Sequence, residues 1–119
     1  MFYFYLKKLN KLKGKKNIDR LFEEGVSVNL FPLRLLFVED EVFSFGVSVG
    51  KRNFKLAVQR NRIKRQMRAA AKLYLLFFLE NTKNPHSYML IYTGKKMPEW
   101  NKLTEDFKNL AKKVSSKKL

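Results

Sequence analysis

The sequence contains no cysteine, which excludes disulfide bonds, thiolate nucleophiles and zinc–thiolate sites and fits a reducing cytoplasm. Its one histidine, His86, follows a proline in a predicted loop, where we expect a surface position. No Gly-x-Ser-x-Gly elbow, Walker motif or dinucleotide-binding fingerprint is present. No pair of histidine or carboxylate residues has the spacing of a metal site. These absences argue against catalysis by the protein's own side chains.

Acidic residues are also scarce, with 10 Asp and Glu against 26 Lys and Arg, so the formal net charge is +16. Such self-repulsion predicts a polyanionic partner, which could be nucleic acid, an anionic membrane or a ribosome-like assembly. No apolar run approaches the roughly 18 residues that a membrane span needs. The apolar start, Met1–Leu6, precedes the lysines, whereas a secretory signal places its charges first. We therefore interpret residues 1–10 as an N-terminal extension.

The length of 119 residues and the 45% hydrophobic content predict a single domain, residues 1–119, with an ordinary core. Hydrophobic periodicity predicts the order α-β-β-α-β-α, and it allows an additional strand at Val26–Leu30. We expect an α+β fold, a two-layer sandwich with helices packed on one face of a small mixed sheet. The predicted elements are a helix capped by Asn17 and ending at Gly25, strands at 33–38 and 43–50, a helix at 56–80, a strand at 87–93, a helix starting near Glu99 or Thr104, and a frayed tail at 115–119.

Four local patterns add detail to this prediction. Residues 73–79 are apolar on all sides of the long helix, so we expect them to be buried on most sides. The strand at 87–93 is apolar on both faces and should lie at the centre of the sheet. The triplet Glu39-Asp40-Glu41 is interpreted as a solvated hairpin tip, because three consecutive carboxylates cannot easily converge on one metal ion. In the strand at 43–50, small residues occupy one face, which lets another layer or a ligand come close.

The most informative stretch runs from Arg60 to Arg68 on the predicted long helix. At about 100° per residue its polar residues fall on one arc, and Ile63 and Met67 fall on a narrower apolar arc. No Asp or Glu occurs from Val42 to Leu79, so the positive charge stays unpaired. Arginine forks suit phosphates and guanine edges, which favours nucleic-acid binding. A generic solvated helix face and a membrane-surface helix are the alternatives.

This stretch also carries a family resemblance. The segment from Lys51 to Arg65, KRNFKLAVQRNRIKR, closely resembles the RNR signature of the protein subunit of bacterial ribonuclease P. Phe45-Gly46-Val47-Ser48-Val49 is similar to that family's G-L-[ST]-V strand, and Leu21-Phe22-Glu23-Glu24-Gly25 is similar to the end of its first helix. The resemblance runs in order from about Leu12 to Val114. It implies an α/β sandwich with a left-handed β-α-β crossover, against the usual right-handed preference.

The resemblance implies a function as well. A ribonuclease P protein joins a catalytic RNA in a ribonucleoprotein, binds the 5′ leader of precursor tRNA and assists the endonucleolytic hydrolysis that leaves the mature tRNA 5′ end. Mg²⁺ ions bound by the RNA carry the hydrolysis, and neither a membrane nor a protein partner is required. A structural RNA-binding protein of ribosomal or chaperone type is the rival class, and DNA binding is the third.

The resemblance also assigns residues. By analogy with the family, the contacts to the catalytic RNA fall on Lys51, Arg52, Arg60, Asn61, Arg62, Lys64, Arg65 and Arg68. A cleft between the sheet and the first helix would take the single-stranded leader by aromatic stacking. Its candidates are Phe22, for which core packing is the alternative, together with Phe31, Phe43 and Phe45. Whether a metal ion is held near Asn61 is left open.

Overall fold

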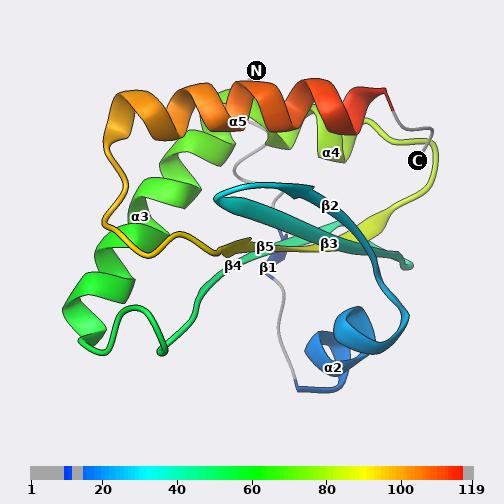
Figure 1. Ribbon diagram of the computed structural model, residues 1–119. Helices are drawn as coiled ribbons and strands as arrows, with labels where there is room; N and C mark the ends of the chain where they lie inside the picture. The colour runs from blue at the N-terminus through cyan, green and yellow to red at the C-terminus, as the bar shows by residue number, and fades with distance from the viewer. Residues whose placement is uncertain (1–9, 12–14, 117–119) are drawn as a thin grey trace.

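The computed structural model of the chain describes residues 10–11 and 15–116 (Figure 1). The additional strand at Val26–Leu30 is present, and the last helix starts near Glu99 as one of the two expected positions. The predicted extension and tail lie largely outside the described residues. The elements are β1 (Asn10–Lys11), α2 (Lys15–Glu24), β2 (Val26–Leu30), β3 (Leu33–Glu39), β4 (Ser44–Val49), α3 (Ala57–Tyr74), α4 (Leu76–Glu80), β5 (His86–Tyr92) and α5 (Trp100–Ser115).

In the part of the chain that the structure describes, five strands form one mixed sheet in the order β1-β4-β5-β3-β2. β4 pairs in parallel with both β1 and β5, whereas β3 pairs antiparallel with both β2 and β5. β5 therefore lies at the centre of the sheet, as its apolar character on both faces predicted. The expected α+β class with a small mixed sheet is confirmed.

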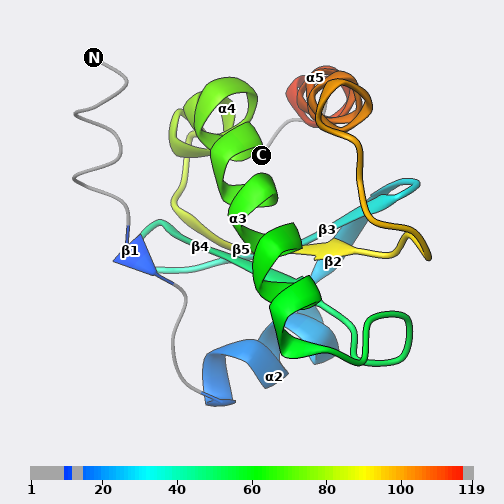
Figure 2. The same ribbon diagram turned by 90° about the vertical axis from the view of Figure 1, so that its left-hand side faces the viewer.

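The connection from β4 through α3 to β5 has an unusual hand. In Figure 1 both strands run from right to left and α3 lies above the sheet. Figure 2, seen from that left-hand side, places β5 to the right of β4, and α3 rises in front of both strands to α4 above the sheet. The crossover is therefore left-handed, as the resemblance implied, although parallel crossovers are right-handed in about 98% of cases.

The alternation of side chains along the strands separates two apolar clusters. On one face, Leu35 of β3 and Leu90 of β5 belong to the main core with Ile63 of α3 and Phe107 of α5. On the other face, Leu36 and Met89 pack with Leu21 of α2 in a smaller cluster. Figure 1 accordingly shows α3, α4 and α5 above the sheet and α2 below it. Our expectation that all helices share one face was wrong for α2, because its apolar stripe does not specify which side of the sheet it covers.

The predicted long helix is two helices. α3 ends at Tyr74, and Leu75, with φ −120° and ψ −45°, joins it to the short α4. Leu75, Leu76 and Leu79 are buried, but Leu73, Phe77 and Phe78 are about half exposed. The expectation that residues 73–79 are buried on most sides was therefore wrong, because this segment packs on the core with only one side.

Several smaller boundaries and burials also differ from the predictions. α2 begins at Lys15, so Asn17 lies inside the helix and is not its N-cap. The other end of α2 agrees with the prediction, because the helix stops directly before Gly25. There the Gly25 N–H donates to the Leu21 carbonyl at 2.9 Å, and a Cβ at Gly25 would collide with that oxygen. His86, expected at the surface, is 7% exposed, and its Nδ1–H donates a 2.7 Å hydrogen bond to the Asn84 carbonyl oxygen.

The acidic turn between β3 and β4 ties α2 to the sheet. Arg20 of α2 donates from Nη2 to the Glu39 carbonyl at 2.8 Å, and its Nη1 lies 3.8 Å from Asp40 Oδ1. Asp40 Oδ2 accepts a 2.6 Å hydrogen bond from the Ser87 hydroxyl, which itself accepts one from Ser44 at 2.8 Å. The triplet is therefore not merely a solvated tip, since Asp40 links α2, β4 and β5.

This network predicts a pH-dependent contribution to stability. The pKa of Asp40 lies below its ordinary value of 3.8, first because the Ser87 hydroxyl donates to the carboxylate and further because of the Glu41 N–H and Arg20. A folded-state pKa below the unfolded one stabilises the protein above about pH 4, and this stabilisation is lost as the pH falls through the folded value. Asp40→Asn should lower the free energy of unfolding at neutral pH by about 1 kcal/mol.

Denaturant unfolding of both proteins between pH 2 and pH 7 measures this effect. The difference in free energy of unfolding between the wild type and Asp40→Asn should become smaller as the pH falls below about 4. Glu23→Gln, on an exposed side chain of α2, is the control, and its free energy of unfolding should change with pH as that of the wild type does. A difference between wild type and Asp40→Asn that stays constant through the acid range would contradict a stabilising role for the ionised Asp40.

Candidate nucleic-acid interface

The buried side of α3 fixes the direction of its charges. Ile63, Met67, Ala70 and Ala71 face the core, as the helical spacing predicted for Ile63 and Met67. The polar residues lie on the remaining surface, where Lys64 is half-buried. The exposed members are Asn61, Arg62, Arg65, Arg68 and Lys72, and Lys51 and Arg52 are exposed in the connection before the helix.

This surface is not neutralised by the protein itself. The ion pairs formed within residues 10–11 and 15–116 join Arg20 to Glu24 and Asp40, and Lys102 to Asp106. None of them involves a cation of α3. The helix also has no acidic residue in its first turn and no side-chain cap, so the positive end of its dipole adds to the same potential. We call this surface, formed by α3 and residues 51–55, the α3 face.

Arg60 differs from the other predicted contacts. Its Nη1 donates to the carbonyl oxygens of Phe54 and Lys55, at 2.8 Å each, and the side chain is half-buried. Phe54 is itself buried in the main core. Arg60 therefore fastens the connection that carries Lys51 and Arg52 onto the first turn of the helix, and only its remaining donors point elsewhere.

A second basic loop extends the α3 face. β4 and β5 are parallel, so the segments that follow them leave the same edge of the sheet. Asn53 Nδ2 lies 3.5 Å from the Gly94 carbonyl oxygen, and the Phe54 and Tyr92 rings are 6.1 Å apart between centroids. The exposed Lys95 and Lys96 thus belong to the loop beside residues 51–55. We did not predict these lysines as site residues, although two lysines directly after a predicted strand were a usable signal.

The structure separates the four phenylalanines that were candidates for the leader cleft. Phe22, 56% exposed, lies on α2, and Phe31, 76% exposed, lies in the β2–β3 turn. Phe45 is buried in the main core, and Phe43 packs against that core with its ring 5.8 Å from Tyr88. The expectation that Phe43 and Phe45 line a cleft beside α2 was wrong, because the alternation of β4 turns both side chains toward the helices on the opposite face.

The face of the sheet beside α2 offers a different set of groups. The strand register aligns Ser48, Ile91, Arg34 and Asn29 in a row across β4, β5, β3 and β2. Arg34 and Asn29 are exposed, and Ser48 and Ile91 are partly exposed. The sequence analysis did not name Arg34 as a site residue, although a single arginine within an otherwise apolar strand marks a position that faces solvent. We call this row, together with Phe22, the α2 face.

Other classes of site are not formed by the described residues. No group of three or more His, Cys, Asp or Glu side chains among them could hold a metal ion. None of their helices is both long and apolar enough to cross a membrane. The fully buried Tyr88 donates to the Leu79 carbonyl at 3.2 Å, and burial raises its pKa to about 12, so it is a structural donor within the core.

Comparison with known proteins identifies the family. The family model Ribonuclease P matches residues 6–115. The chain belongs to the Ribonuclease P family. It is 30% identical over 118 residues to a ribonuclease P protein component of Acholeplasma laidlawii, covering 96% of this chain and 94% of the relative. A ribonuclease P protein component of Rippkaea orientalis is 31% identical over 85 residues, covering 66% and 67% of the two chains.

Solved structures share the fold. The ribonuclease P protein of Staphylococcus aureus matches with a TM-score of 0.70 at 20% identity, over 87% of this chain and 94% of that one. The ribonuclease P protein of Thermotoga maritima matches with a TM-score of 0.69 at 19% identity, over 87% and 96%. Membership of the family makes the chain a protein component of the endoribonuclease that matures tRNA 5′ ends, and it implies partnership with ribonuclease P RNA. The role in tRNA 5′ processing that the RNR resemblance implied is thus confirmed, while binding of the 5′ leader and the roles of single residues stay predictions.

The contacts of Arg60 lead to a prediction about the loop. Arg60→Ala removes two hydrogen bonds from a charged donor and should lower the free energy of unfolding by about 1.5–3 kcal/mol. Amide hydrogen exchange should accelerate in residues 53–58 of the variant. Arg65→Ala, which removes an exposed arginine from the same helix, should change neither quantity measurably. Equal protection of residues 53–58 in both variants would show that Arg60 does not hold the loop.

Proposed function

We propose that the α3 face binds the catalytic RNA of ribonuclease P. The observation that carries this proposal is the row of exposed cations on α3 that no acidic side chain of the described residues pairs. Phosphates of a folded RNA would neutralise these cations. Each arginine guanidinium would bridge two phosphate oxygens, and the lysines would act as point charges. The contributing residues are Lys51, Arg52, Asn61, Arg62, Lys64, Arg65 and Arg68, with Arg60 acting mainly by holding the loop.

We further propose that the α2 face receives the single-stranded 5′ leader of precursor tRNA. Phe22 is an exposed aromatic ring on which a base can stack, and the exposed Arg34 supplies a cation on the face of the sheet that α2 covers. The small side chains of Ser44, Gly46 and Ser48 on this face let a nucleotide approach the strands closely. The α2 and α3 faces lie on different sides of the molecule (Figure 1), so one protein can contact two RNA segments at once.

The expected contribution to cleavage is electrostatic. Mg²⁺ supplies the metal-assisted hydrolysis, and no cluster of carboxylates in the described part of the protein fits a resident ion. The protein's cations would neutralise phosphates that otherwise demand Mg²⁺ to approach one another. On this basis the protein lowers the Mg²⁺ concentration at which the RNA folds and grips its substrate.

Arg65 provides a test of the α3 face. Because each phosphate contact releases condensed counterions, Arg65→Ala should reduce the steepness of log K against log salt by about 1 for binding to the catalytic RNA. Lys83→Ala, at an exposed lysine before the start of β5, is the matched control and should keep the wild-type slope. Filter binding or fluorescence anisotropy over a salt series measures both. An unchanged slope for Arg65→Ala would mean that this arginine touches no phosphate.

A cleavage assay tests the function and the α2 face together. At a Mg²⁺ concentration too low for the RNA alone, the wild-type protein should stimulate release of the leader from precursor tRNA. Phe22→Ala should lose about tenfold in affinity for the leader-bearing substrate, as expected for one lost stacking contact, and nothing for mature tRNA. Phe78→Ala, a phenylalanine of similar exposure on α4, should behave as the wild type.

The two possible failures of this assay have different meanings. Absence of stimulation by the wild-type protein would contradict the proposed function as a whole. Normal stimulation combined with full activity of Phe22→Ala would contradict only the placement of the leader on the α2 face.

A further inference from the structure

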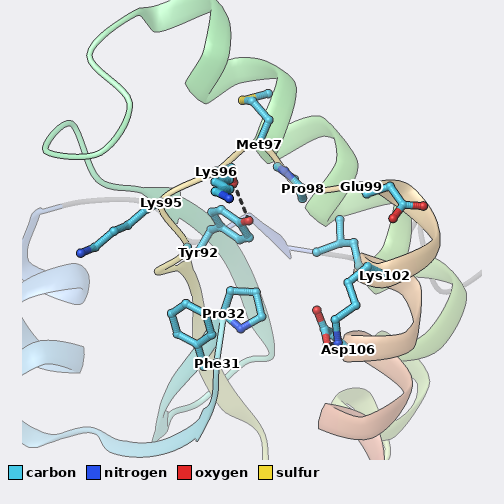
Figure 3. Close-up of a pocket in the computed structure, with 12 residues that line it drawn as sticks. Phe31, Pro32, Tyr92, Lys95, Lys96, Met97, Pro98, Glu99, Lys102 and Asp106 are labelled. Atoms are coloured by element: carbon cyan, nitrogen blue, oxygen red, sulfur yellow. Dashed lines mark hydrogen bonds and ion pairs between the residues drawn. The ribbon is translucent and has the colours of Figure 1, made fainter.

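A cavity lies at the end of β5, beside the basic loop that extends the α3 face. It has a volume of about 460 Å³ and is enclosed by the β2–β3 turn, the loop after β5 and the first turns of α5. Figure 3 shows Phe31, Pro32 and Tyr92 on one side and the Lys102–Asp106 pair on the other, with Met97 and Pro98 above the space between them. A cavity of this size, mostly apolar with a few polar groups, is typical of a ligand site.

The apolar side of the cavity offers a flat surface. Phe31 is 76% exposed, and the adjoining Pro32 fixes the backbone beside it. Tyr92 is buried, and its hydroxyl donates to the Lys96 carbonyl at 2.8 Å, so the wall behind Phe31 is held in place. An exposed aromatic ring on a rigid wall can stack on another planar ring at little cost in conformational entropy.

The opposite side carries an unusual carboxylate. Asp106 is 4% exposed, and no other carboxylate is buried among the described residues. Burying this charge is costly unless it is paired, and Lys102 Nζ donates to Asp106 Oδ1 at 3.0 Å. Burial raises the pKa of Tyr92, and the negative charge of Asp106 raises it further. A lysine donor and a carboxylate acceptor thus stand side by side opposite the apolar wall of Phe31 and Pro32, which is the pattern that recognises the edge of a base.

The exposed charges around the opening are mainly positive, three lysines against Glu99, and this favours a polyanion over a peptide. Lys95 points away from the cavity in Figure 3, toward the outer surface, and Lys96 follows it in the same loop. That loop touches residues 51–55 through Asn53 and Gly94, so the surroundings of the cavity continue into the α3 face. A nucleic acid strand leaving the α3 face would therefore meet cations as far as the cavity.

We propose that this cavity binds one unpaired nucleobase of an RNA strand, with the base stacked on Phe31 and its edge facing Lys102 and Asp106. Lys95 and Lys96 hold the adjoining phosphates. Guanine suits the site best, because its N1–H and amino group donate to a carboxylate while its O6 accepts from the lysine. This inference rests on the proposed function only in taking RNA as the ligand, and it adds a base-reading site to a surface otherwise directed at phosphates.

Binding of short RNA probes tests the cavity directly. The probes are a single-stranded uridine oligomer and the same oligomer with one central guanosine, titrated against the full chain at fixed salt. The guanosine oligomer should bind more tightly to the wild type, and Phe31→Ala should weaken its binding about tenfold. Asp106→Asn should abolish the preference for guanosine. Phe78→Ala is the matched control for loss of an exposed phenylalanine and should bind as the wild type.

Circular dichroism and thermal unfolding establish that each variant is folded. Phe31 is exposed, so its truncation keeps the test decisive even if Asp106→Asn proves unstable. Unchanged affinity of Phe31→Ala for the guanosine oligomer would overturn the proposal. It would leave the proposed function intact if Arg65→Ala and the cleavage assay behave as expected, so the two failures are distinguishable.

Cross-linking in the assembled complex identifies the source of the base. Because the chain has no cysteine, the thiol of Met97→Cys can be alkylated with a single photoreactive label at the edge of the cavity. In a complex of the protein, catalytic RNA and precursor tRNA, a cross-link to an unpaired nucleotide of either RNA supports the proposal and names the strand. Cross-links to neither RNA, or to a second copy of the protein, would overturn it.

Discussion

The packing of α3 on the sheet is the constraint on which the rest of the molecule depends. Ile63 and Met67 are fully buried, and a helix that commits one side to a core must present the opposite side to solvent. The left-handed crossover then sets α3 across β4 and β5, and the loops that follow these two strands leave the same edge. The α3 face, the loop held by Arg60 and the cavity beside Tyr92 all follow from that arrangement.

The residues that share one side of α3 or of β4 could be predicted from the sequence, because they follow from the local periodicity of the helix and the strand. Burial of Ile63 and Met67 follows from a period of 3.6 residues, and the alternation around Phe45 follows from a period of two. The alternation was identified correctly, but its direction was not, since nothing local says which face of a sheet meets which helices. That missing information misplaced Phe43 and Phe45 and put α2 on the wrong side.

Other features depend on contacts between distant parts of the chain. Arg60 looks like its basic neighbours in the sequence, and only the folded loop brings the carbonyl oxygens of Phe54 and Lys55 to its guanidinium. The cavity joins Phe31, Tyr92 and Asp106, which no single periodicity connects. Even the hand of the crossover came from the family resemblance, because the parallel pairing of β4 and β5 is compatible with either hand until the whole sheet is assembled.

The break at Leu75 has a consequence for how an RNA would be recognised. It limits α3 to 18 residues, a helix about 27 Å long at the usual rise per residue. Backbone hydrogen bonds fix the spacing of the arginines along this helix, so the spacing would not change when an RNA binds. If the proposed binding holds, the helix would act as a template, and a flexible polyanion would have to fold until its phosphates match the spacing of the arginines.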